Sequence, residues 1–349
     1  MVEDRPAELL DGISRDSKIL ELGASVSPMA PRSAGWNVTV IDHATQAELI
    51  EKYKVDPNVT VENIEKVDFV WKNGPLHEVV PAELLGTFDV LIASHVIEHL
   101  PDPIGFMQSA TKLLHPQRGQ LALAVPDKRW CFDYLKQVSS TGQFLAAHRM
   151  GAQRHSLATR FDHSAYIAFN HGRPAWGRER LTGLKLADTL DHAYSEFQSW
   201  TDDPNVPYVD CHAWHFTPAS FALLILEAAD IGLLDWRVEW LRPRAGVEFF
   251  TRLVRGRQHF SSPAERENRR TELLKQILLD LREQTDWLVD STEPKPIVVQ
   301  GGFDEEAKQN LQQIAETAAA LRNAMRPGRA IWHQMLPLRR TVAKLRGRA

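Results

Sequence analysis

The stretch ILELGASVSPMAPR, residues 19–32, decides the fold of this chain. A short apolar run leads into Gly23 and then into two small residues, Ala24 and Ser25. A strand that ends in a glycine turn is typical of folds in which a ligand approaches the backbone closely. A dinucleotide-binding loop would carry three glycines, and this stretch contains one. The pattern therefore predicts a nucleotide-like ligand that needs no pyrophosphate nest.

The composition is that of an ordinary soluble globular chain. Of its 349 residues, 43% are hydrophobic and 25% are charged, and this length allows two domains or one domain with appendages. A net charge of -4 argues against a general nucleic-acid-binding protein. Cys131 and Cys211 lie far apart, which favours a reducing compartment and no disulfide framework. With neither a secretory signal nor a membrane span in view, we expect a cytoplasmic protein.

Strand and helix patterns alternate through the first half and return near the middle of the chain. Such alternation predicts a doubly wound parallel sheet. We expect a helix to begin at Thr217 and Pro218, and an antiparallel hairpin to follow it. Dehydrogenases of the Rossmann type lack that terminal hairpin. The expected strands are residues 18–23, 37–42, 67–71, 88–95, 119–127, 236–242 and 247–255, with a helix over 104–115.

Changes in pattern divide the chain into four parts. Residues 1–127 and 216–256 predict one core, interrupted by residues 128–215, which are rich in His, Trp, Arg and Asp. We expect this insertion to bind the substrate, because it follows the carboxyl end of a strand. Residues 257–349 predict a helical C-terminal extension. It fits either a helix packed on its own domain or an oligomer contact, since apolar residues recur there at spacings of three and four: Leu311, Ile314, Ala318, Leu321 and Met325.

The last residues, LRRTVAKLRGRA, form a basic and weakly amphipathic tail. One interpretation is a solvated, frayed terminus. The other is a tether to an acidic partner or to the inner face of a membrane, which carries negative charge.

Four stretches together resemble the class I S-adenosylmethionine-dependent methyltransferases: ILELGASVSP, VTVIDHA, FDVLIASHVIEHLPDP and LALAVPD. The resemblance implies a Rossmann-like α/β fold with seven strands, the last two forming the hairpin expected above. It also implies methyl transfer with S-adenosylmethionine as cofactor. The family usually has glycine where this chain has Ser25, and often near Ser27. Serine at position 25 costs little if its φ is negative.

The resemblance places the cofactor at the carboxyl ends of the strands. Glu21 matches an acidic residue near the amino end of the ligand, and Asp42 is suited to accept hydrogen bonds from both ribose hydroxyls. Structural alternatives are that Glu21 caps a loop and Asp42 caps a helix. Asn73, or with weaker reason Asp68, would meet the adenine. The complete expected set is Glu21, Gly23, Ala24, Ser25, Asp42, His43, Asn73, Ser94 and His95, with the last two near the sulfonium methyl.

A hydroxyl acceptor needs a general base, and histidine is the side chain suited to neutral pH. His95, at a strand end, is the first candidate, whereas His99 reads as a residue on a helix face. The neighbours Asp162 and His163 predict a base with its orienting carboxylate, or a pair of metal ligands, and so do Asp210 and His212. Because no strict metal-ligand spacing is present, we expect no metal.

The acceptor is predicted from the composition of the insertion and from a second resemblance. The insertion combines Trp130, Trp176, Trp200 and Trp214 with polar side chains, which suits a sugar. The chain also resembles bacterial methyltransferases of surface-polysaccharide assembly in AVPDKRWCFDYL and HAWHFTPASF. This implies O-methylation of a sugar nucleotide or glycan, with a glycosyltransferase or assembly partner. The alternatives are a small aromatic, quinone-like or lipid acceptor, or a non-catalytic scaffold. An NAD-dependent enzyme is disfavoured by the missing glycines.

Overall fold

The computed structural model describes residues 4–201, 208–288, 312–313 and 316–317. The chain forms two compact units, residues 1–291 and 292–349. All elements discussed below belong to the first unit. The apolar repeat from Leu311 to Met325 and the basic tail lie almost wholly outside the described residues. Both expectations therefore remain predictions.

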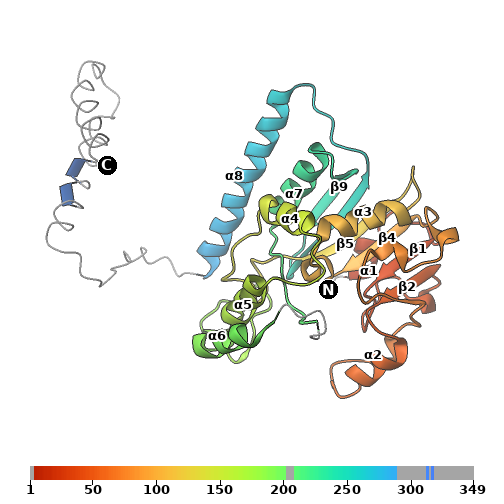
Figure 1. The fold of residues 1–349 in the computed structure, drawn as a ribbon, viewed down its shortest axis with the longest axis horizontal. Helices are drawn as coiled ribbons and strands as arrows, with labels where there is room; N and C mark the ends of the chain where they lie inside the picture. Colours follow the sequence, from red (N-terminus) through yellow and green to blue (C-terminus); the bar gives the residue numbers. More distant parts are fainter. Residues whose placement is uncertain (1–3, 202–207, 289–311, 314–315, 318–349) are drawn as a thin grey trace. The chain divides into compact units, whose positions relative to one another are not determined.

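A seven-stranded sheet organises the first unit (Figure 1), with strand order β3-β2-β1-β4-β5-β10-β9. Five strands are parallel, and β10 runs antiparallel to both of its neighbours. This topology confirms the predicted α/β fold with its terminal hairpin. The strands are β1 (Ile19–Leu22), β2 (Val38–Asp42), β3 (Phe69–Val70), β4 (Val90–Ser94), β5 (Gln120–Pro126), β9 (Trp236–Pro243) and β10 (Glu248–Arg255).

Helices cover one face of the sheet more fully than the other. Leu20 and Leu22 of β1 pack in one cluster with apolar side chains of α3 (Pro103–Leu113) and α7 (Pro218–Asp230). Ile19, pointing the opposite way, packs in a second cluster with α1 (Arg5–Leu9). The other described helices of the core are α2 (Gln46–Tyr53) and α8 (Pro263–Leu288), with short 3-10 turns η2 (Val61–Asn63), η3 (Leu76–Glu78), η4 (Ala82–Leu84) and η5 (Ile97–His99).

The connection from β1 to β2 contains no α-helix, although its length suggested one. Its only regular piece is the 3-10 turn η1 (Arg32–Ala34). Pro28 and Pro31 explain the difference, because proline removes a helical hydrogen bond and its ring clashes with the preceding turn. Met29 and Ala30 in this loop are buried in the second cluster and take the place of a helix on that face.

The insertion forms a small substructure that the sequence did not reveal. It contains α4 (Thr141–Arg149), α5 (Leu157–Tyr166), α6 (Leu190–Ser199) and a three-stranded antiparallel sheet, ordered β7-β6-β8, of β6 (Ala168–Asn170), β7 (Arg173–Pro174) and β8 (Leu184–Leu186). These strands are too short to produce a recognisable period.

The long helix α8 fastens the start of the insertion to the core. It packs on α7 through Leu273, which is buried against Leu223 and Leu226. Near its end, Gln284 accepts a hydrogen bond from Nζ of Lys128 at 3.0 Å. The first part of the predicted C-terminal extension is therefore built into the core unit.

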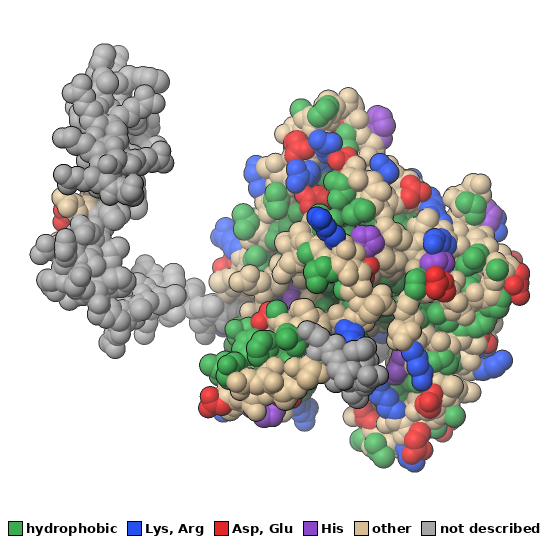
Figure 2. Space-filling model, in the orientation of Figure 1, with side chains coloured by type: hydrophobic (Ala, Val, Ile, Leu, Met, Phe, Trp, Pro, Cys, Tyr) green, Lys and Arg blue, Asp and Glu red, His purple; other side chains and the backbone are tan. Residues whose placement is uncertain are grey.

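Figure 2 shows acidic and basic side chains intermixed on the visible face of the core unit. In the same view, hydrophobic side chains gather over the region of α5 and α6. Within the described ranges, no helix combines the length and the apolar character needed to cross a membrane.

Candidate active site

The predicted cofactor residues meet at one edge of the sheet. Leu22 of β1 is in register with Ile41 of β2 and Ala93 of β4. The next residue of each strand, Gly23, Asp42 and Ser94, therefore reaches the same level at the carboxyl end. The strand order reverses between β1 and β4, and open α/β sheets bind ligands at such a switch point.

Gly23 makes the turn that opens this edge. Its φ is +72°, and a Cβ atom there would lie 2.9 Å from Cγ2 of Val96. Both facts exclude a side chain. Ser25 also has a positive φ, of +40°, so the condition under which serine would cost little is not met. The Ser25 N–H donates a hydrogen bond to Oδ2 of Asp42 at 3.1 Å, and this contact holds the backbone of Ser25 in that conformation.

Asp42 is 2% exposed and already accepts several hydrogen bonds. Its Oδ1 accepts the N–H of His43 at 2.7 Å and lies 2.7 Å from Nδ1 of the same residue. The His43 side chain is 57% exposed and can rotate away. Asp42 thus supports the first loop, and moving the His43 ring would free it for a ribose.

Glu21 faces the loop between β1 and β2. It is 1% exposed, and its two oxygens accept the N–H groups of Met29 at 2.6 Å and Ala30 at 3.0 Å. Burial raises the pKa of Glu21 to about 7, although these two hydrogen bonds favour the charged form. The structure thus gives Glu21 a role in holding the loop, as the structural alternative expected. Its contact with the ligand remains a prediction.

Of the two residues predicted to contact the adenine, only Asn73 has a side chain free to do so in the described structure. Asn73 is exposed just after β3. Asp68 is occupied, because its Oδ2 accepts from the guanidinium of Arg32 at 2.5 Å and from the N–H of Val40 at 2.9 Å. A hollow on the outer side of the first loop is lined by residues such as Ser27 and residues 62–66, and by none of the predicted cofactor residues.

His95 forms a hydrogen-bonded pair with a carboxylate of the terminal hairpin. Its Nε2 lies 2.9 Å from Oε2 of Glu248, at the start of β10. Arg5 donates two hydrogen bonds of 2.7 Å to Glu248, and Arg244 donates one of 2.8 Å. Burial alone would raise the pKa of Glu248, but His95 and Arg5 hold it at about 2. The ionised Glu248 can only accept, so Nε2 of His95 carries a hydrogen, and the lone pair of the neutral imidazole is then on Nδ1.

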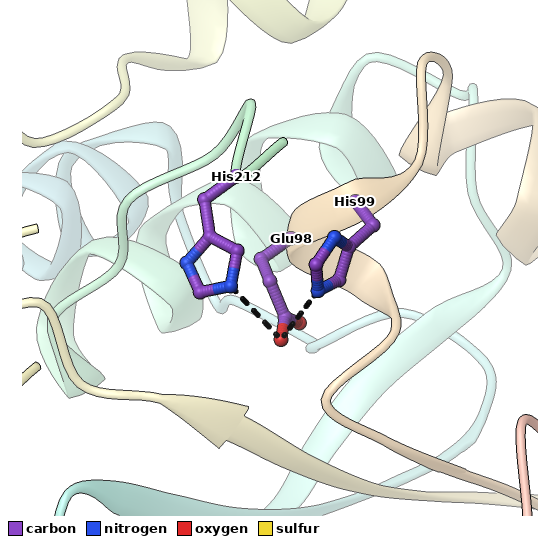
Figure 3. Close-up of side chains that lie close together, drawn as sticks. All are labelled: Glu98, His99 and His212. Atoms are coloured by element: carbon purple, nitrogen blue, oxygen red, sulfur yellow. Dashed lines mark ion pairs between the residues drawn. The ribbon is translucent and has the colours of Figure 1, made fainter. Parts of the chain in front are cut away.

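His99 and His212 lie side by side although they come from distant segments (Figure 3). Nδ1 of His99 donates to Asp210 at 2.8 Å, and Nδ1 of His212 donates to Asp133 at 2.6 Å. The predicted pairing of Asp210 with His212 is therefore wrong, because each has a different partner. The placement of His99 on a helix face is also wrong, since η5 is a single 3-10 turn and His95 lies outside it at φ +53°.

Three of these groups have shifted pKa values. Burial opposes protonation of His99, yet the hydrogen bond to Asp210 and the nearby Glu98 carboxylate raise its pKa. The same hydrogen bond lowers the pKa of Asp210 to about 2. Burial raises the pKa of Asp133, but His212 and Lys136 outweigh it and hold that pKa well below its usual range.

Asp162 and His163 do not form a pair in the described structure. Nδ1 of His163 lies 3.4 Å from Nζ of Lys136, and Asp162 is exposed on α5. Burial lowers the pKa of His163 to about 3, with Lys136 adding to the effect. A group held neutral in this way at pH 7 keeps its lone pair, but its contacts are with Lys136 and not with the sheet edge that carries His95.

The four tryptophans expected to stack on a sugar lie in different surroundings. Trp130 and Trp214 are 1% and 8% exposed and belong to the core. Trp200 lies beside α5, 5.9 Å from the guanidinium of Arg160. Trp176 is 47% exposed, and its ring centroid is 6.0 Å from that of His95. Among these four, Trp176 is therefore the one that borders the candidate site.

The residues at this edge fit S-adenosylmethionine. The glycine turn at Gly23 brings backbone close to the ligand, and no phosphate nest is needed because this cofactor has no phosphate. Asp42 would supply a buried carboxylate for the ribose, and His95 directly follows β4, where an acceptor would meet the methyl group. Sequence reasoning missed Glu248 and Glu98, because each becomes part of the site only through strand and loop pairing.

Comparison with known proteins agrees with this reading. A family model described as a methyltransferase domain matches residues 2–180, just over half of the chain. The ubiquinone biosynthesis O-methyltransferase of Actinobacillus pleuropneumoniae serotype 7 (strain AP76) is 32% identical over 104 residues, which cover 28% of this chain and 42% of that protein. The match thus spans less than half the length of this relative.

Likenesses to solved structures are weak. A SAM-dependent methyltransferase from Methanosarcina mazei is 16% identical with a TM-score of 0.34, covering 70% of this chain and 95% of the other. A 1,6-didemethyltoxoflavin-N1-methyltransferase from Burkholderia thailandensis, solved with S-adenosylhomocysteine, is 14% identical with a TM-score of 0.34, covering 73% and 78%. TM-scores this low support no conclusion about the function of this chain. The match to the family model over more than half of the chain shows that this chain belongs to the methyltransferase-domain family.

Proposed function

We propose that this methyltransferase acts on a hydroxyl group and that His95 is the general base. The observation that carries the proposal is the His95–Glu248 pair at the end of β4. An ionised Glu248 orients the imidazole so that Nδ1 faces away from it, 3.8 Å from Oε1 of Glu98, while Trp176 borders the ring. A neutral imidazole held in this way can take the proton of a hydroxyl as the oxygen becomes a nucleophile.

The cofactor supplies a methyl group on a positively charged sulfur, which becomes neutral when the methyl group leaves. The acceptor oxygen forms the new C–O bond and its proton passes to Nδ1 of His95. Glu248 stabilises the imidazolium that results, and Arg5 and Arg244 keep this carboxylate ionised and fixed. Holding the reacting groups in line supplies much of the remaining rate enhancement.

A sugar nucleotide or glycan is the acceptor that we favour. The half-exposed indole of Trp176 beside His95 offers a flat face for a sugar ring, and His95 is paired with the charged Glu248. Charged surroundings suit a hydroxylated acceptor better than an apolar one. Because three of the four tryptophans point elsewhere, this support rests on Trp176 together with the resemblance described above.

A quinone-like aromatic acceptor is the second candidate. The sequence similarity to a ubiquinone biosynthesis O-methyltransferase favours it. Trp176 and Phe132, whose ring centroids lie 5.7 Å apart, would then stack on an aromatic ring.

The test incubates the full chain with S-adenosylmethionine and a panel of sugar nucleotides and catechols, and locates any added methyl group by NMR. We expect O-methylation of a sugar hydroxyl. In His95→Asn, which tolerates the left-handed backbone at this position, kcat should fall by about 100-fold or more while S-adenosylhomocysteine binds as before. Exposed His192 on α6, changed to Asn, is the control. Methyl transfer to nitrogen or carbon, or an unchanged kcat in His95→Asn, would contradict the proposal.

A further inference from the structure

The carboxylate of Glu98 is buried without a hydrogen-bond partner. The residue is 1% exposed, and neither Oε1 nor Oε2 has a hydrogen-bond partner in the described structure. A buried carboxylate costs several kcal/mol unless a cation or hydrogen-bond donors compensate it. The nearest side chains are imidazoles at 3.6–4.0 Å from Oε1, beyond hydrogen-bond distance, and a bound cation would compensate the carboxylate directly.

Two imidazole nitrogens converge on this carboxylate (Figure 3). Nε2 of His99 lies 3.6 Å from Oε1 of Glu98, and Nε2 of His212 lies 4.0 Å from the same atom. The three ligand atoms lie within 4.8 Å of one another. Ligand atoms bound to one ion at ~2.1 Å are roughly 3.0–3.4 Å apart, so side-chain rotations that close the gaps by up to about 1.4 Å would bring all three atoms into range.

Both histidines are oriented as metal ligands are. Each donates its Nδ1 hydrogen to a carboxylate, Asp210 for His99 and Asp133 for His212. With Nδ1 fixed as the donor to these carboxylates, Nε2 is the nitrogen of each ring that faces Glu98, and it is the ligand atom of the neutral imidazole. Carboxylate–histidine pairs of this kind orient the ligands in metal sites and raise their basicity.

The backbone and the charges support the same conclusion. The carbonyl oxygen of Glu98 accepts the N–H of Ala213 at 2.8 Å, so η5 and the segment carrying His212 are joined at the site. Three carboxylates, of Glu98, Asp133 and Asp210, gather here, and Lys136 contributes one positive charge to Asp133. A doubly charged cation would balance the remaining two negative charges.

We propose that Glu98, His99 and His212 bind one divalent transition-metal ion, with Zn²⁺ the best match. Two imidazoles and one carboxylate that leave a coordination position open form a common catalytic zinc site, and the same ligands also serve Fe²⁺. Mg²⁺ prefers oxygen ligands and is disfavoured. The sequence expectation of no metal arose because His212 is too far along the chain from Glu98 and His99 to form a recognisable spacing with them.

The site adjoins the proposed base, because Nδ1 of His95 lies 3.8 Å from Oε1 of Glu98. If the proposed function holds, the open coordination position binds the acceptor oxygen and favours its loss of a proton to His95. The metal site itself does not depend on that function, since its residues can be tested without any acceptor.

The experiment removes metal from the full chain with a chelator, titrates it with Zn²⁺ by calorimetry, and counts bound metal by mass spectrometry. We expect one Zn²⁺ per chain, Fe²⁺ as a competitor, and no comparable binding of Mg²⁺. Glu98→Gln and His212→Ala should weaken Zn²⁺ binding by roughly 100-fold or more, because even changes behind the ligands cost 10–100-fold.

Asp210→Asn keeps the test decisive if a buried variant fails to fold, because the Asp210 side chain is 70% exposed. It should weaken Zn²⁺ binding by about 10–100-fold. His192→Ala, in a second acidic and histidine cluster on α6, should bind Zn²⁺ like the wild type. No tight Zn²⁺ binding by the wild type, loss of binding in His192→Ala, or full binding in both Glu98→Gln and Asp210→Asn would overturn the site. If the metal-free wild type still transfers methyl groups, the proposed function does not require the metal.

Discussion

Replacing Asp42 with Asn should weaken the binding of S-adenosylhomocysteine strongly. A carboxylate offers about four acceptor positions, and three contacts already reach Asp42, from the Ser25 N–H and from the N–H and ring of His43. Binding both ribose hydroxyls therefore requires the exposed His43 ring to move. Asparagine removes the charge and turns an NH₂ group toward one of the N–H donors, so it weakens the ribose contacts and distorts the loop.

The size of the effect follows from these contacts. Hydrogen bonds to a charged group contribute about 1.5–3 kcal/mol each, and asparagine retains part of one. We expect a net loss of about 2–3 kcal/mol, which is roughly a 30- to 150-fold rise in Kd. Calorimetric titration with S-adenosylhomocysteine measures it directly. Circular dichroism shows whether the variant is folded.

Two further variants sharpen the result. Asp68→Asn changes a nearby carboxylate that is tied to Arg32 and Val40, and its Kd should stay within about threefold of the wild type. His43→Ala removes the ring that competes for Asp42 and should leave Kd unchanged or lower it. An unchanged Kd in Asp42→Asn, or a greater loss in Asp68→Asn, would refute the assignment of the ribose to Asp42.

Three other predictions concern stability and are measured by urea unfolding. Ser25→Gly should change the free energy of unfolding by less than about 1 kcal/mol, because relief of the positive φ offsets the entropy of glycine, whereas Ser25→Val should lose more than this. The folded chain keeps His163 neutral down to a pKa of about 3, while the unfolded chain protonates it below its ordinary 6.5. Stability is therefore lost as pH falls from 7 toward 3, and His163→Gln should reduce the loss between pH 7 and pH 5 by about 2 kcal/mol. Arg129→Met should cost about 3–5 kcal/mol, because it leaves the buried Asp127 carboxylate without its partner. An equal pH dependence in His163→Gln, or a mild Arg129→Met, would contradict the burial described for these groups.

Much of the fold could be predicted from the sequence because parallel strands buried on both faces read as continuous apolar runs, as in β1 and β4. The runs of β2 and β4 located Asp42, which is the last residue of β2, and His95, which directly follows β4. The loop after β1 was harder, since its shape depends on Glu21 binding two backbone N–H groups and on Asp42 holding Ser25 at a positive φ.

The histidine cluster could not be predicted, because its geometry is set by contacts between distant segments. Asp210 and His212 are neighbours in sequence, yet one pairs with His99 of η5 and the other with Asp133 of the insertion. Glu98 carried no sequence signal at all. Its importance comes from burial without a partner, which only the folded chain reveals.

The most direct test of the account is a crystal structure of the chain with S-adenosylhomocysteine. The central claim is that the carboxyl ends of β1, β2 and β4 hold the cofactor, with its reacting end beside His95. We predict that both ribose hydroxyls contact Asp42 and that the sulfur points past Ser94 toward His95 and Glu98. A ligand bound instead in the hollow outside the first loop, or a sulfur directed away from His95, would contradict the assignment of the base and of the methyl-transfer site.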